Sequence, residues 1–514
     1  MTDLTAAIRP SAGDFARAWA EGRGQLITLT LPADLDTPVS LMMRLAPPGT
    51  PYGFMLESVT GGEVRGRYSV VGCAPDLIWR CRDGKVDVNR GAGAADGGQF
   101  VPDIAPALDS LRALLAESRL DLPEGVPPMA AGLFGYLGYD MVRLVENLPQ
   151  TRPDPLDLPD AMLIRPSLVA VLDGVRGEVM LCVPAWPGAG GDAASAYAAA
   201  QARLAEALAA LDRPVPAARM PNAAPPLHLD PKSNFTREAY MEAVEKTRAY
   251  IRAGDIFQAV PAQRWAADFP LPPFALYRSL RHTNPSPFMF YLDMGGFHIV
   301  GASPEILVRL RAGEVTIRPI AGTRPRGRDL AHDRELEAEL LADPKERAEH
   351  LMLLDLGRND VGRVAKMGTV RPTEEFVIER YSHVMHIVSN VVGELREGED
   401  ALSALLAGLP AGTVSGAPKV RAMQIIDELE PEKRGVYGGG VGYFSADGDM
   451  DMCIALRTAV VKDGVLYVQS GGGVVHDSDP AAEFEETVNK SRALMRAAEG
   501  ATRYLSNGAG EAEG

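Results

Sequence analysis

Apolar and polar residues alternate over several short segments of the chain, and Asp-Gly pairs separate these segments. Residues 77–82 and 85–89 flank one such pair, and 443–446, 449–461 and 465–470 are separated in the same way. Asp-Gly favours the tight turns that join antiparallel strands. This pattern predicts antiparallel β-hairpins in both halves of the chain.

Helical segments lie between the predicted hairpins. Residues 193–211 are rich in alanine, which has the highest helix propensity, and further helices are expected at 237–253 and 344–356. The helices are interspersed among the hairpins and do not alternate strictly with strands. The sequence therefore predicts an α+β fold with antiparallel sheets.

Composition divides the chain near residue 225. The 514 residues exceed the roughly 250–300 at which a single hydrophobic core stops growing, so two domains are expected. The proline cluster that follows residue 211 cannot continue a helix and is typical of a semi-rigid linker. We expect one region at 1–225, a second domain at 226–505, a flexible tail at 506–514 and a flexible loop at 91–98.

Charge and cysteine usage exclude several classes of protein. The 52 Lys+Arg against 68 Asp+Glu give a net charge of −16, which argues against a binder of nucleic acid or of membrane surfaces. The first residues lack the pattern of a signal peptide, and no apolar stretch approaches the roughly 18 residues of a membrane span. The four cysteines form no CxxC pair and are typical of reduced thiols in a cytoplasmic protein: Cys73, Cys81, Cys182 and Cys453.

The common motifs of other enzyme classes are missing. The chain has no GxxxxGK[ST] phosphate loop and no HExxH zinc motif. The glycine clusters at 438–440 and 471–473 do not fit GxGxxG, and 412–416 does not fit GxSxG. The absence of these motifs argues against a kinase, a Rossmann oxidoreductase, a serine hydrolase or a zinc enzyme.

Two pairs of glutamates have the spacing that places side chains on one face of a helix. Glu346 and Glu349 are three residues apart, and so are Glu483 and Glu486. Four carboxylates that converge from two helices suit a hard cation such as Mg²⁺. The alternative is that each pair is a solvated acidic face, which is the more frequent case for a single pair.

Glycines beside these glutamates favour an anion site. A glycine run at 471–473 precedes the second pair, and such a run presents backbone N–H groups to an anion. The Gly-Thr pairs within 319–327 and 410–419 either line an anion site with backbone amides and hydroxyls or form ordinary turns. Lys490 falls near the face of the second pair and is expected to meet a carboxylate.

Six segments resemble the chorismate-utilising enzyme family, and they occur in the family's order between residues 235 and 495. They are GDIFQAV, PIAGTRPRG, EHLMLLDLGRNDVGR, HVMHIVS, LPAGTVSGAPK and GGGVVHDSDPAAEFEETVNK. The segment 54–72 resembles the regulatory domain of the anthranilate-forming members. The resemblance implies a sandwich-like core of antiparallel sheets flanked by helices, with a regulatory region at 1–225 and a chorismate-binding catalytic domain at 226–505.

The resemblance also implies a Mg²⁺ ion that holds the ring carboxylate of chorismate. Glu349 and Glu486 match the nearest ligands, with Glu346 and Glu483 beside them through water. The residues that match positions around the carboxylates of the substrate are Gly322, Thr323, Thr413, Tyr437, Arg457, Gly471, Gly472, Gly473 and Lys490.

Two catalytic side chains follow from the same resemblance, and Thr413 is grouped with them. Glu305 matches the general acid that protonates the leaving C4 hydroxyl while a nucleophile adds at C2. His386 matches the histidine required for the elimination of pyruvate. Without the resemblance, Glu305 would be a solvated carboxylate at a strand end and His386 a structural histidine.

Two positions favour ammonia as the nucleophile. Ala321 stands where similar aminodeoxychorismate synthases carry a lysine that attacks C2, and a methyl group cannot attack. Gln258 stands where isochorismate and salicylate synthases carry a lysine that activates water, and an amide cannot serve as that base. No cysteine has the GxCxG flanks of a glutaminase, so the resemblance implies a separate glutamine amidotransferase subunit that supplies the ammonia.

Feedback inhibition by L-tryptophan is a further implication of the resemblance. The matching positions are Leu56, Glu57, Ser58, Asn284, Pro285, Pro287, Phe288, Met289, Tyr443 and Cys453. The lysine that usually follows the serine is missing, and Arg65 and Arg67 are the basic residues available. The alternative is that these positions are ordinary core residues between domains.

We expect an enzyme that converts chorismate and ammonia to anthranilate and pyruvate, the first step of L-tryptophan biosynthesis. One alternative is an aminodeoxychorismate synthase that lacks the lysine, whose product carries nitrogen para to the carboxylate. Another is a catalytically silent subunit that binds tryptophan and a glutaminase. The presence of Glu305, His386 and all four glutamates counts against the silent subunit.

Overall fold

The computed structural model describes residues 7–58, 66–91, 97–149, 152–187, 191–215, 225–381 and 384–505. Most of the expected loop at 91–98, Arg65, the middle of the expected linker and the tail at 506–514 lie outside the described residues. The helices are α1 (Ala12–Ala20), α2 (Pro38–Leu45), α3 (Ala107–Glu117), α4 (Ala193–Leu211), α5 (Arg237–Ala253), α6 (Pro273–Thr283), α7 (Leu330–Ala342), α8 (Pro344–Gly362), α9 (Ala401–Gly408), α10 (Lys419–Leu429) and α11 (Pro480–Glu499).

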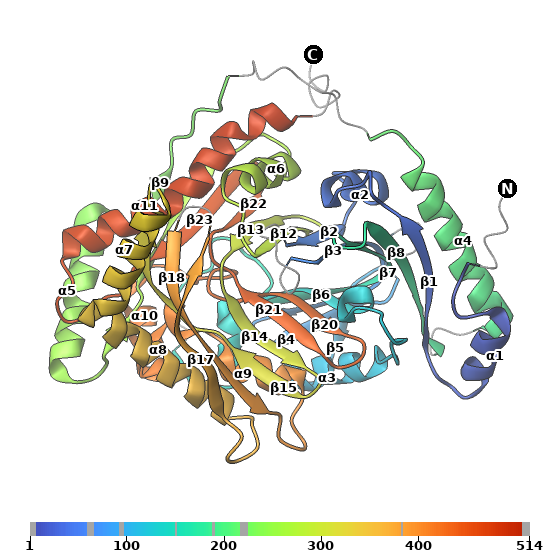
Figure 1. The fold of residues 1–514 in the computed structure, drawn as a ribbon, viewed down its shortest axis with the longest axis horizontal. Helices are drawn as coiled ribbons and strands as arrows, with labels where there is room; N and C mark the ends of the chain where they lie inside the picture. Colours follow the sequence, from blue (N-terminus) through green and yellow to red (C-terminus); the bar gives the residue numbers. More distant parts are fainter. Residues whose placement is uncertain are drawn as a thin grey trace.

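Antiparallel strands form two layers that face each other (Figure 1). The first layer has the order β1 (Gln25–Pro32), β8 (Glu178–Ala185), β7 (Ala161–Asp173), β3 (Tyr68–Arg82), β2 (Phe54–Glu57), β12 (Phe288–Asp293), β13 (His298–Ser303), β22 (Thr458–Lys462), β23 (Val465–Gly471), β11 (Ala262–Asp268) and β9 (Lys232–Ser233).

The second layer shares β3 and β7 with the first. Its order is β5 (Val101–Asp103), β4 (Lys85–Asn89), β3, β7, β6 (Gly132–Leu137), β20 (Gly440–Ser445), β21 (Met450–Ile454), β14 (Ile306–Arg311), β15 (Glu314–Ile317) and β18 (Val384–Glu394). Both β16 (Ile320–Pro325) and β17 (Arg371–Arg380) pair with β18. A separate short pair joins β10 (Gln258–Ala259) to β19 (Gly416–Ala417).

An irregularity in the middle of β3 lets this strand serve both layers. Its first part pairs with β2 and its last part with β4. Between these parts the β3–β7 ladder is irregular at Pro75/Leu77, and Ala74 has a φ of 51°. Proline has no N–H to donate to the ladder, so the strand changes direction there.

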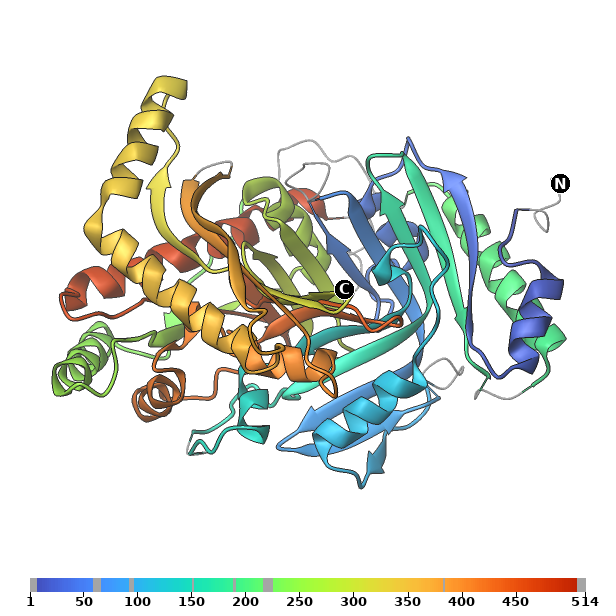
Figure 2. The same cartoon turned by 60° about the horizontal axis from the view of Figure 1, so that its bottom comes forward.

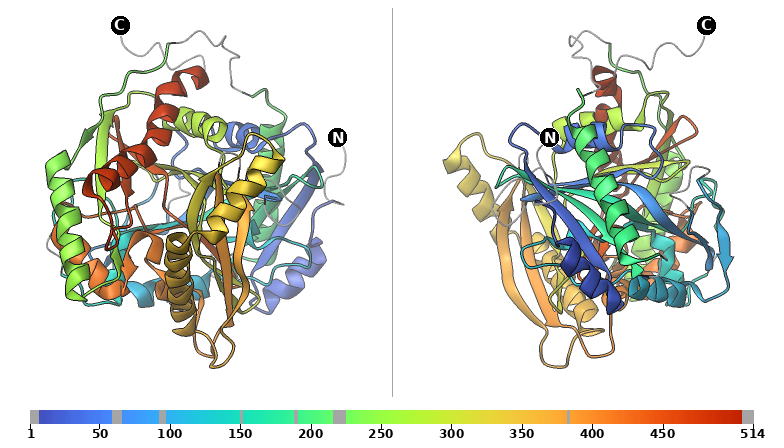
Figure 3. Two further views of the ribbon diagram at one scale, coloured as in Figure 1. Left: turned by 60° about the vertical axis from the view of Figure 1, so that its left-hand side comes forward. Right: turned by 90° about the vertical axis from the view of Figure 1, so that its right-hand side faces the viewer.

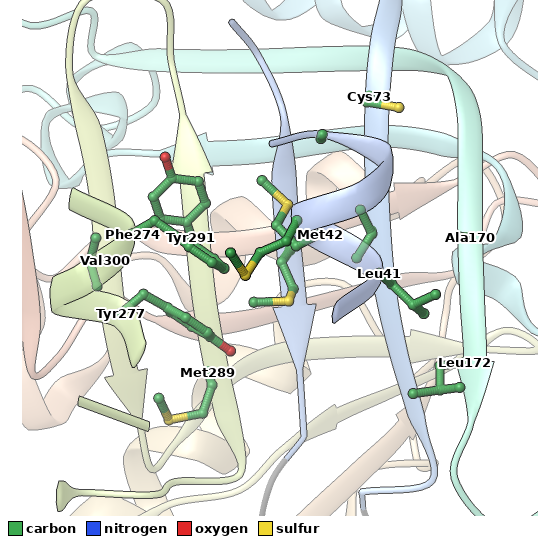
Figure 4. Close-up of a cluster of buried hydrophobic side chains, with 14 of the residues drawn as sticks. Leu41, Met42, Cys73, Ala170, Leu172, Phe274, Tyr277, Met289, Tyr291 and Val300 are labelled. Atoms are coloured by element: carbon green, nitrogen blue, oxygen red, sulfur yellow. The ribbon is translucent and has the colours of Figure 1, made fainter. Parts of the chain in front are cut away.

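Side chains of each strand alternate between the space inside the two layers and the helices outside. In β2, Phe54 packs between the layers, whereas Met55 packs against the outer helices. Figure 4 shows this outer group, in which side chains of α2 and α6 lie over β2, β3 and β12: Leu41, Met42, Cys73, Phe274, Tyr277, Met289 and Tyr291. This period of two is the one expected of half-buried strands.

Helices cover the outer faces of both layers (Figures 2 and 3). The first layer is covered by α1, α2, α4, α6 and α11, and the second by α3, α8 and α9. The predicted helices are confirmed, although α8 continues to Gly362, beyond the expected end at residue 356. The predicted α+β sandwich flanked by helices is therefore confirmed.

The Asp-Gly turns are confirmed as hairpin turns. Asp83-Gly84 joins β3 to β4 and Asp463-Gly464 joins β22 to β23, with positive φ at both residues of each pair. Positive φ at two central residues is the geometry that Asp-Gly favours. The third pair, at 447–448, joins β20 to β21.

Strands from both sides of residue 225 pair with one another. In the first layer β2 pairs with β12, and in the second β6 pairs with β20. Both layers are thus built jointly by the two halves, and the division of roles between 1–225 and 226–505 stays a prediction. The four cysteines are free and buried, and none of the helices described is long and apolar enough to cross a membrane.

Candidate active site

Helices α8 and α11 begin in the same way and carry the two glutamate pairs. Their N-cap residues, Asp343 and Asp479, accept hydrogen bonds from first-turn backbone N–H groups, and each is followed by a proline. Glu346 and Glu483 lie in these first turns. The capped starts therefore fix where each glutamate pair projects from its helix.

Two of the four glutamates, Glu349 and Glu483, have shifted pKa values. Burial raises the pKa of Glu349, and the charges of Glu346 and Glu486 raise it further. Burial likewise raises the pKa of Glu483, whose Oε2 is buried without a hydrogen-bond partner in the described part of the chain. Such carboxylates gain from a nearby cation.

Basic side chains hold the other two glutamates. Arg324 Nη1 lies 3.1 Å from Glu346, and Lys490 Nζ lies 2.7 Å from Glu486, as expected of Lys490. Within the described ranges no three His, Cys, Asp or Glu side chains are gathered closely enough to hold a metal ion by themselves. The glutamates therefore do not form a closed ligand set, and Mg²⁺ binding stays a prediction.

Glycines keep the space beside the glutamates open. A Cβ at Gly472 would lie 2.8 Å from Glu483 Oε2, and one at Gly473 would lie 2.5 Å from Gln258 Nε2. The carbonyl of Gly471 accepts a hydrogen bond from Lys490 Nζ at 3.0 Å. Tyr437 is buried and packs against the same run: a Cβ placed on Gly471 would lie 3.1 Å from the Tyr437 hydroxyl oxygen. The run thus forms one wall of a space bounded by carboxylates and Lys490.

Glu305 is a buried carboxyl group, so its solvated alternative is wrong. It is only 6% exposed, and it lies between β13 and β14. Thr413, in a 3₁₀ turn at Gly412–Val414, donates from Oγ1 to the carboxylate at 3.2–3.3 Å, and the Ile320 backbone also bonds to it. Burial raises the pKa of Glu305 to about 8, against these hydrogen bonds. The group therefore holds a proton at neutral pH, as a general acid requires.

His386 is a neutral imidazole with a defined orientation. It lies on β18, and its Nδ1 is 2.9 Å from the Gly322 carbonyl oxygen and 3.1 Å from Thr323 Oγ1. An Nδ1–H that donates to this carbonyl leaves Nε2 as the proton acceptor. Burial lowers the pKa of His386, which keeps the ring uncharged near pH 7. Gly322 reaches it from a bulge with a φ of 66°.

Arg457 brings a positive charge to the same region. It follows β21 with a φ of 49°, and its carbonyl accepts a hydrogen bond from the Ala302 N–H at 3.1 Å. Burial lowers its pKa, yet arginine stays charged. No carboxylate of the described residues forms an ion pair with it, so the guanidinium is available for an anionic ligand.

Gln258 and Ala321 occupy the two positions that distinguish nucleophiles. Gln258 is buried on β10; its Nε2 lies 3.4 Å from Glu349 Oε1, and its Oε1 has no hydrogen-bond partner among the residues described. Ala321 is buried on β16, directly before Gly322. Neither side chain can act as a base or a nucleophile.

A cavity of about 400 Å³ lies between the two strand layers, and we call it the interlayer cavity. Of the ten positions expected to sense tryptophan, eight line it: Leu56, Glu57, Ser58, Pro287, Phe288, Met289, Tyr443 and Cys453. Glu57 is held there by the Tyr277 hydroxyl and by Arg281, both at 2.6 Å. Arg67 lines it too, paired with Asp173.

Two of the ten positions do not line the interlayer cavity. Asn284 caps the C-terminus of α6, and Pro285 follows it, so the chain reaches the cavity wall only at Pro287. The role expected of these two residues at the effector site stays a prediction.

Several residues that were not among the expected site residues complete the region. Arg324 and Tyr381 are next to matched motifs, at Thr323 and close to His386, so adjacency was the available signal. Arg318 lines the interlayer cavity and pairs with Glu379 at 2.6 Å. No pattern along the chain announces such contacts, because they join separate strands.

A buried arginine supports this region from behind. Arg434 donates to the carbonyl oxygens of Val414 and Val260 at 2.5 and 2.6 Å and pairs with Glu430. It thereby ties the 3₁₀ turn that carries Thr413 to the segment before β11.

Comparisons with known proteins agree with this geometry. Residues 84–496 match the model of a family described as chorismate binding enzyme. The chain is similar to anthranilate synthase component 1 of Cereibacter sphaeroides, with 69% identity over 95% of this chain and 97% of the relative. The same protein of Pseudomonas aeruginosa is 49% identical over 94% of this chain and 97% of its own length.

Solved structures give the same result. Anthranilate synthase component I from Streptococcus pneumoniae superimposes with a TM-score of 0.73 at 37% identity, over 85% of this chain and 94% of that one. The menaquinone-specific isochorismate synthase of Escherichia coli shares the fold at 19% identity, with a TM-score of 0.68 over 96% of this chain and 99% of that one. The family match and the identities over nearly the whole length show that the chain belongs to the chorismate binding enzymes.

Proposed function

We propose that the chain is the chorismate-converting component of an anthranilate synthase, which forms anthranilate, pyruvate and water from chorismate and ammonia. One observation carries this proposal: β16 supports a proton donor and a proton acceptor together. The Ile320 backbone bonds to Glu305, and the Gly322 carbonyl orients His386. A reaction that first expels a hydroxyl and then removes a ring proton needs both.

Chorismate is held by its two carboxylates. Arg457 and Lys490 supply positive charge, and the glycine run at 471–473 supplies open space and backbone groups. Glu349, Glu486, Glu346 and Glu483 fit a Mg²⁺ site, since Mg²⁺ prefers one or two carboxylates together with water and substrate oxygens. When bound there, Mg²⁺ would supply positive charge that neutralises the ring carboxylate of the substrate.

Addition of ammonia uses the proton on Glu305. The nitrogen lone pair forms a bond to C2, both ring double bonds shift by one position, and the C4–O bond breaks as Glu305 protonates the departing hydroxyl. The ammonium group formed at C2 gives up one proton, which restores Glu305 in the balance of the step. Ala321 and Gln258 leave room for ammonia and provide no base for water.

Elimination of pyruvate uses the free Nε2 of His386. This nitrogen removes the proton from C2, the electrons of the C2–H bond complete the aromatic ring, and the C3–O bond breaks. The enolate that departs takes up a proton to become pyruvate. The products therefore balance the chorismate and ammonia consumed.

Ammonia and feedback involve partners of this chain. The name component 1 of the relatives supports a second component, and we propose a glutamine amidotransferase that supplies ammonia. We propose that L-tryptophan occupies the interlayer cavity and inhibits the enzyme. The size of this cavity, about 400 Å³, and its lining by Glu57, Ser58 and Met289 support this role, because cavities of 300 Å³ and more suit small ligands.

The identity of the product tests the proposal. The purified chain is incubated with chorismate, MgCl₂ and ¹⁵N-labelled ammonium salt, and the product is identified by NMR and mass spectrometry. The proposal predicts ¹⁵N ortho to the carboxylate and one pyruvate for each anthranilate. Nitrogen in the para position, or a product without ¹⁵N, would overturn it.

A further inference from the structure

The wall of the interlayer cavity is also the support of the catalytic residues. Pro304 and Ile306, the two neighbours of Glu305 in the chain, line the cavity. So does Ile320, whose backbone bonds to the Glu305 carboxyl group. The cavity wall therefore includes both chain neighbours of the catalytic acid and one of its hydrogen-bond partners.

Tyr381 links the cavity to the catalytic histidine. It lines the cavity, and its ring meets the ring of His386 edge-on at a centroid distance of 5.5 Å. Its hydroxyl donates to Glu379 Oε2 at 2.9 Å, and Glu379 pairs with Arg318, which also lines the cavity. Tyr381 is thus anchored by Glu379 and, through it, by Arg318 at the cavity wall.

The imidazole of His386 depends on this contact. Its hydrogen bonds to Gly322 and Thr323 both involve Nδ1, so they leave rotation about that edge open to the packing of the ring. Aromatic pairs of this kind contribute about 0.5–1.5 kcal/mol beyond the area they bury. A small displacement of Tyr381 therefore changes where Nε2 points.

We propose that Tyr381 is a positioning residue for His386, and that an occupant of the interlayer cavity and the substrate act on each other through it. This inference rests on the proposed function, since it assigns the route by which tryptophan and chorismate are coupled. An occupant that packs against Tyr381 favours one ring position, and chorismate favours the position that orients His386 correctly. The coupling is reciprocal, so each ligand weakens the binding of the other.

Binding measurements without turnover test this coupling. The dissociation constant of tryptophan is measured by calorimetry with Mg²⁺, in the absence of ammonia, with and without saturating chorismate. The coupling ratio is the dissociation constant of tryptophan with chorismate divided by that without chorismate. Couplings between sites typically change affinity by about 5–150-fold, and we expect a coupling ratio in this range for the parent chain. Tyr381→Leu is expected to bring the ratio to within about twofold of one while tryptophan still binds. Tyr381→Phe keeps the ring but loses the hydroxyl that donates to Glu379, and it is expected to give an intermediate ratio.

A second readout separates positioning from general damage to the fold. If Tyr381 orients His386, Tyr381→Leu also releases the non-aromatic amino intermediate, because pyruvate elimination slows more than ammonia addition. Tyr250→Phe is the matched control. The Tyr250 hydroxyl donates to Glu428 at 2.8–2.9 Å as Tyr381 donates to Glu379, but Tyr250 lies on α5 and does not line the interlayer cavity. This control is expected to keep the parental ratio and to release no intermediate.

The outcomes distinguish the inference from the proposed function. A parental ratio in Tyr381→Leu, or an equal loss of coupling in Tyr250→Phe, overturns the inference alone. If Tyr381→Leu does not fold, a parental ratio in Tyr381→Phe overturns it. A parent chain that forms anthranilate but binds no tryptophan overturns the inference and the feedback proposal, and leaves the proposed reaction intact.

Discussion

Replacing Glu305 by glutamine removes the proposed proton donor while keeping its size. With a pKa of about 8, about nine in ten Glu305 side chains hold a proton at pH 7. At the ordinary value of 4.5 the fraction would be about 0.3%, so burial increases the competent form about 300-fold. Loss of a positioned general acid typically costs about 10²–10⁴ in rate. We expect kcat of Glu305→Gln to fall within that range, with a smaller change in KM for chorismate.

The pH profile provides the assay. Because Glu305 must hold its proton, kcat of the parent is expected to fall as pH rises through about 8. His386 must be neutral, and burial lowers its pKa, so the acid limb lies below 6.5. Free ammonia is kept saturating at every pH, since its fraction changes over the same range, and anthranilate is followed by fluorescence.

The glutamine variant should lose the alkaline limb as well as rate. Glu375→Gln, an exposed change on β17, is the matched control and is expected to keep the parental profile. A Glu305→Gln enzyme within tenfold of the parent at pH 7, or one that keeps the alkaline limb, would refute the assignment of Glu305 as the acid.

Four further predictions concern other parts of the molecule. His386→Met should add ammonia but release the amino intermediate in place of anthranilate, as detected by mass spectrometry; near-parental anthranilate formation would contradict its role. Ser58→Phe should fill the interlayer cavity and shift tryptophan inhibition to higher concentrations with turnover kept; an unchanged inhibition curve would remove Ser58 from the site. Glu483→Gln should raise the Mg²⁺ concentration for half-maximal activity about 10–100-fold, and no change would argue against a metal there. Arg434→Leu leaves Glu430 buried without its partner and should lower the free energy of unfolding by about 3–5 kcal/mol in denaturant titrations, whereas a loss below 1 kcal/mol would show that the pair is dispensable.

Local patterns along the chain were enough to predict the elements and several site residues. The Asp-Gly turns and the alanine-rich α4 depend on a few neighbouring residues, so they were predicted correctly. The spacing of Glu346 and Glu349 placed both on α8 for the same reason. The family motifs then identified Glu305 and His386, whose burial and hydrogen bonds only the structure provides.

The remaining features depend on pairing between distant segments. The passage of β3 from one layer to the other follows from a ladder irregularity at Pro75, and nothing near that residue shows which strands it joins. The Arg324–Glu346 pair arises in the same way, from strand β16 and helix α8, which meet only in the fold. The end of α6 at Asn284 is a further example, because a motif that is continuous in sequence reaches the cavity wall only at Pro287.

One fluorescence measurement tests whether this chain makes anthranilate from chorismate and ammonia. The purified chain alone is mixed with chorismate, MgCl₂ and a high concentration of ammonium salt at mildly alkaline pH, with and without tryptophan. We expect anthranilate fluorescence that requires Mg²⁺ and falls when tryptophan is added. No anthranilate, with either a para-amino product or no turnover at all, would contradict it.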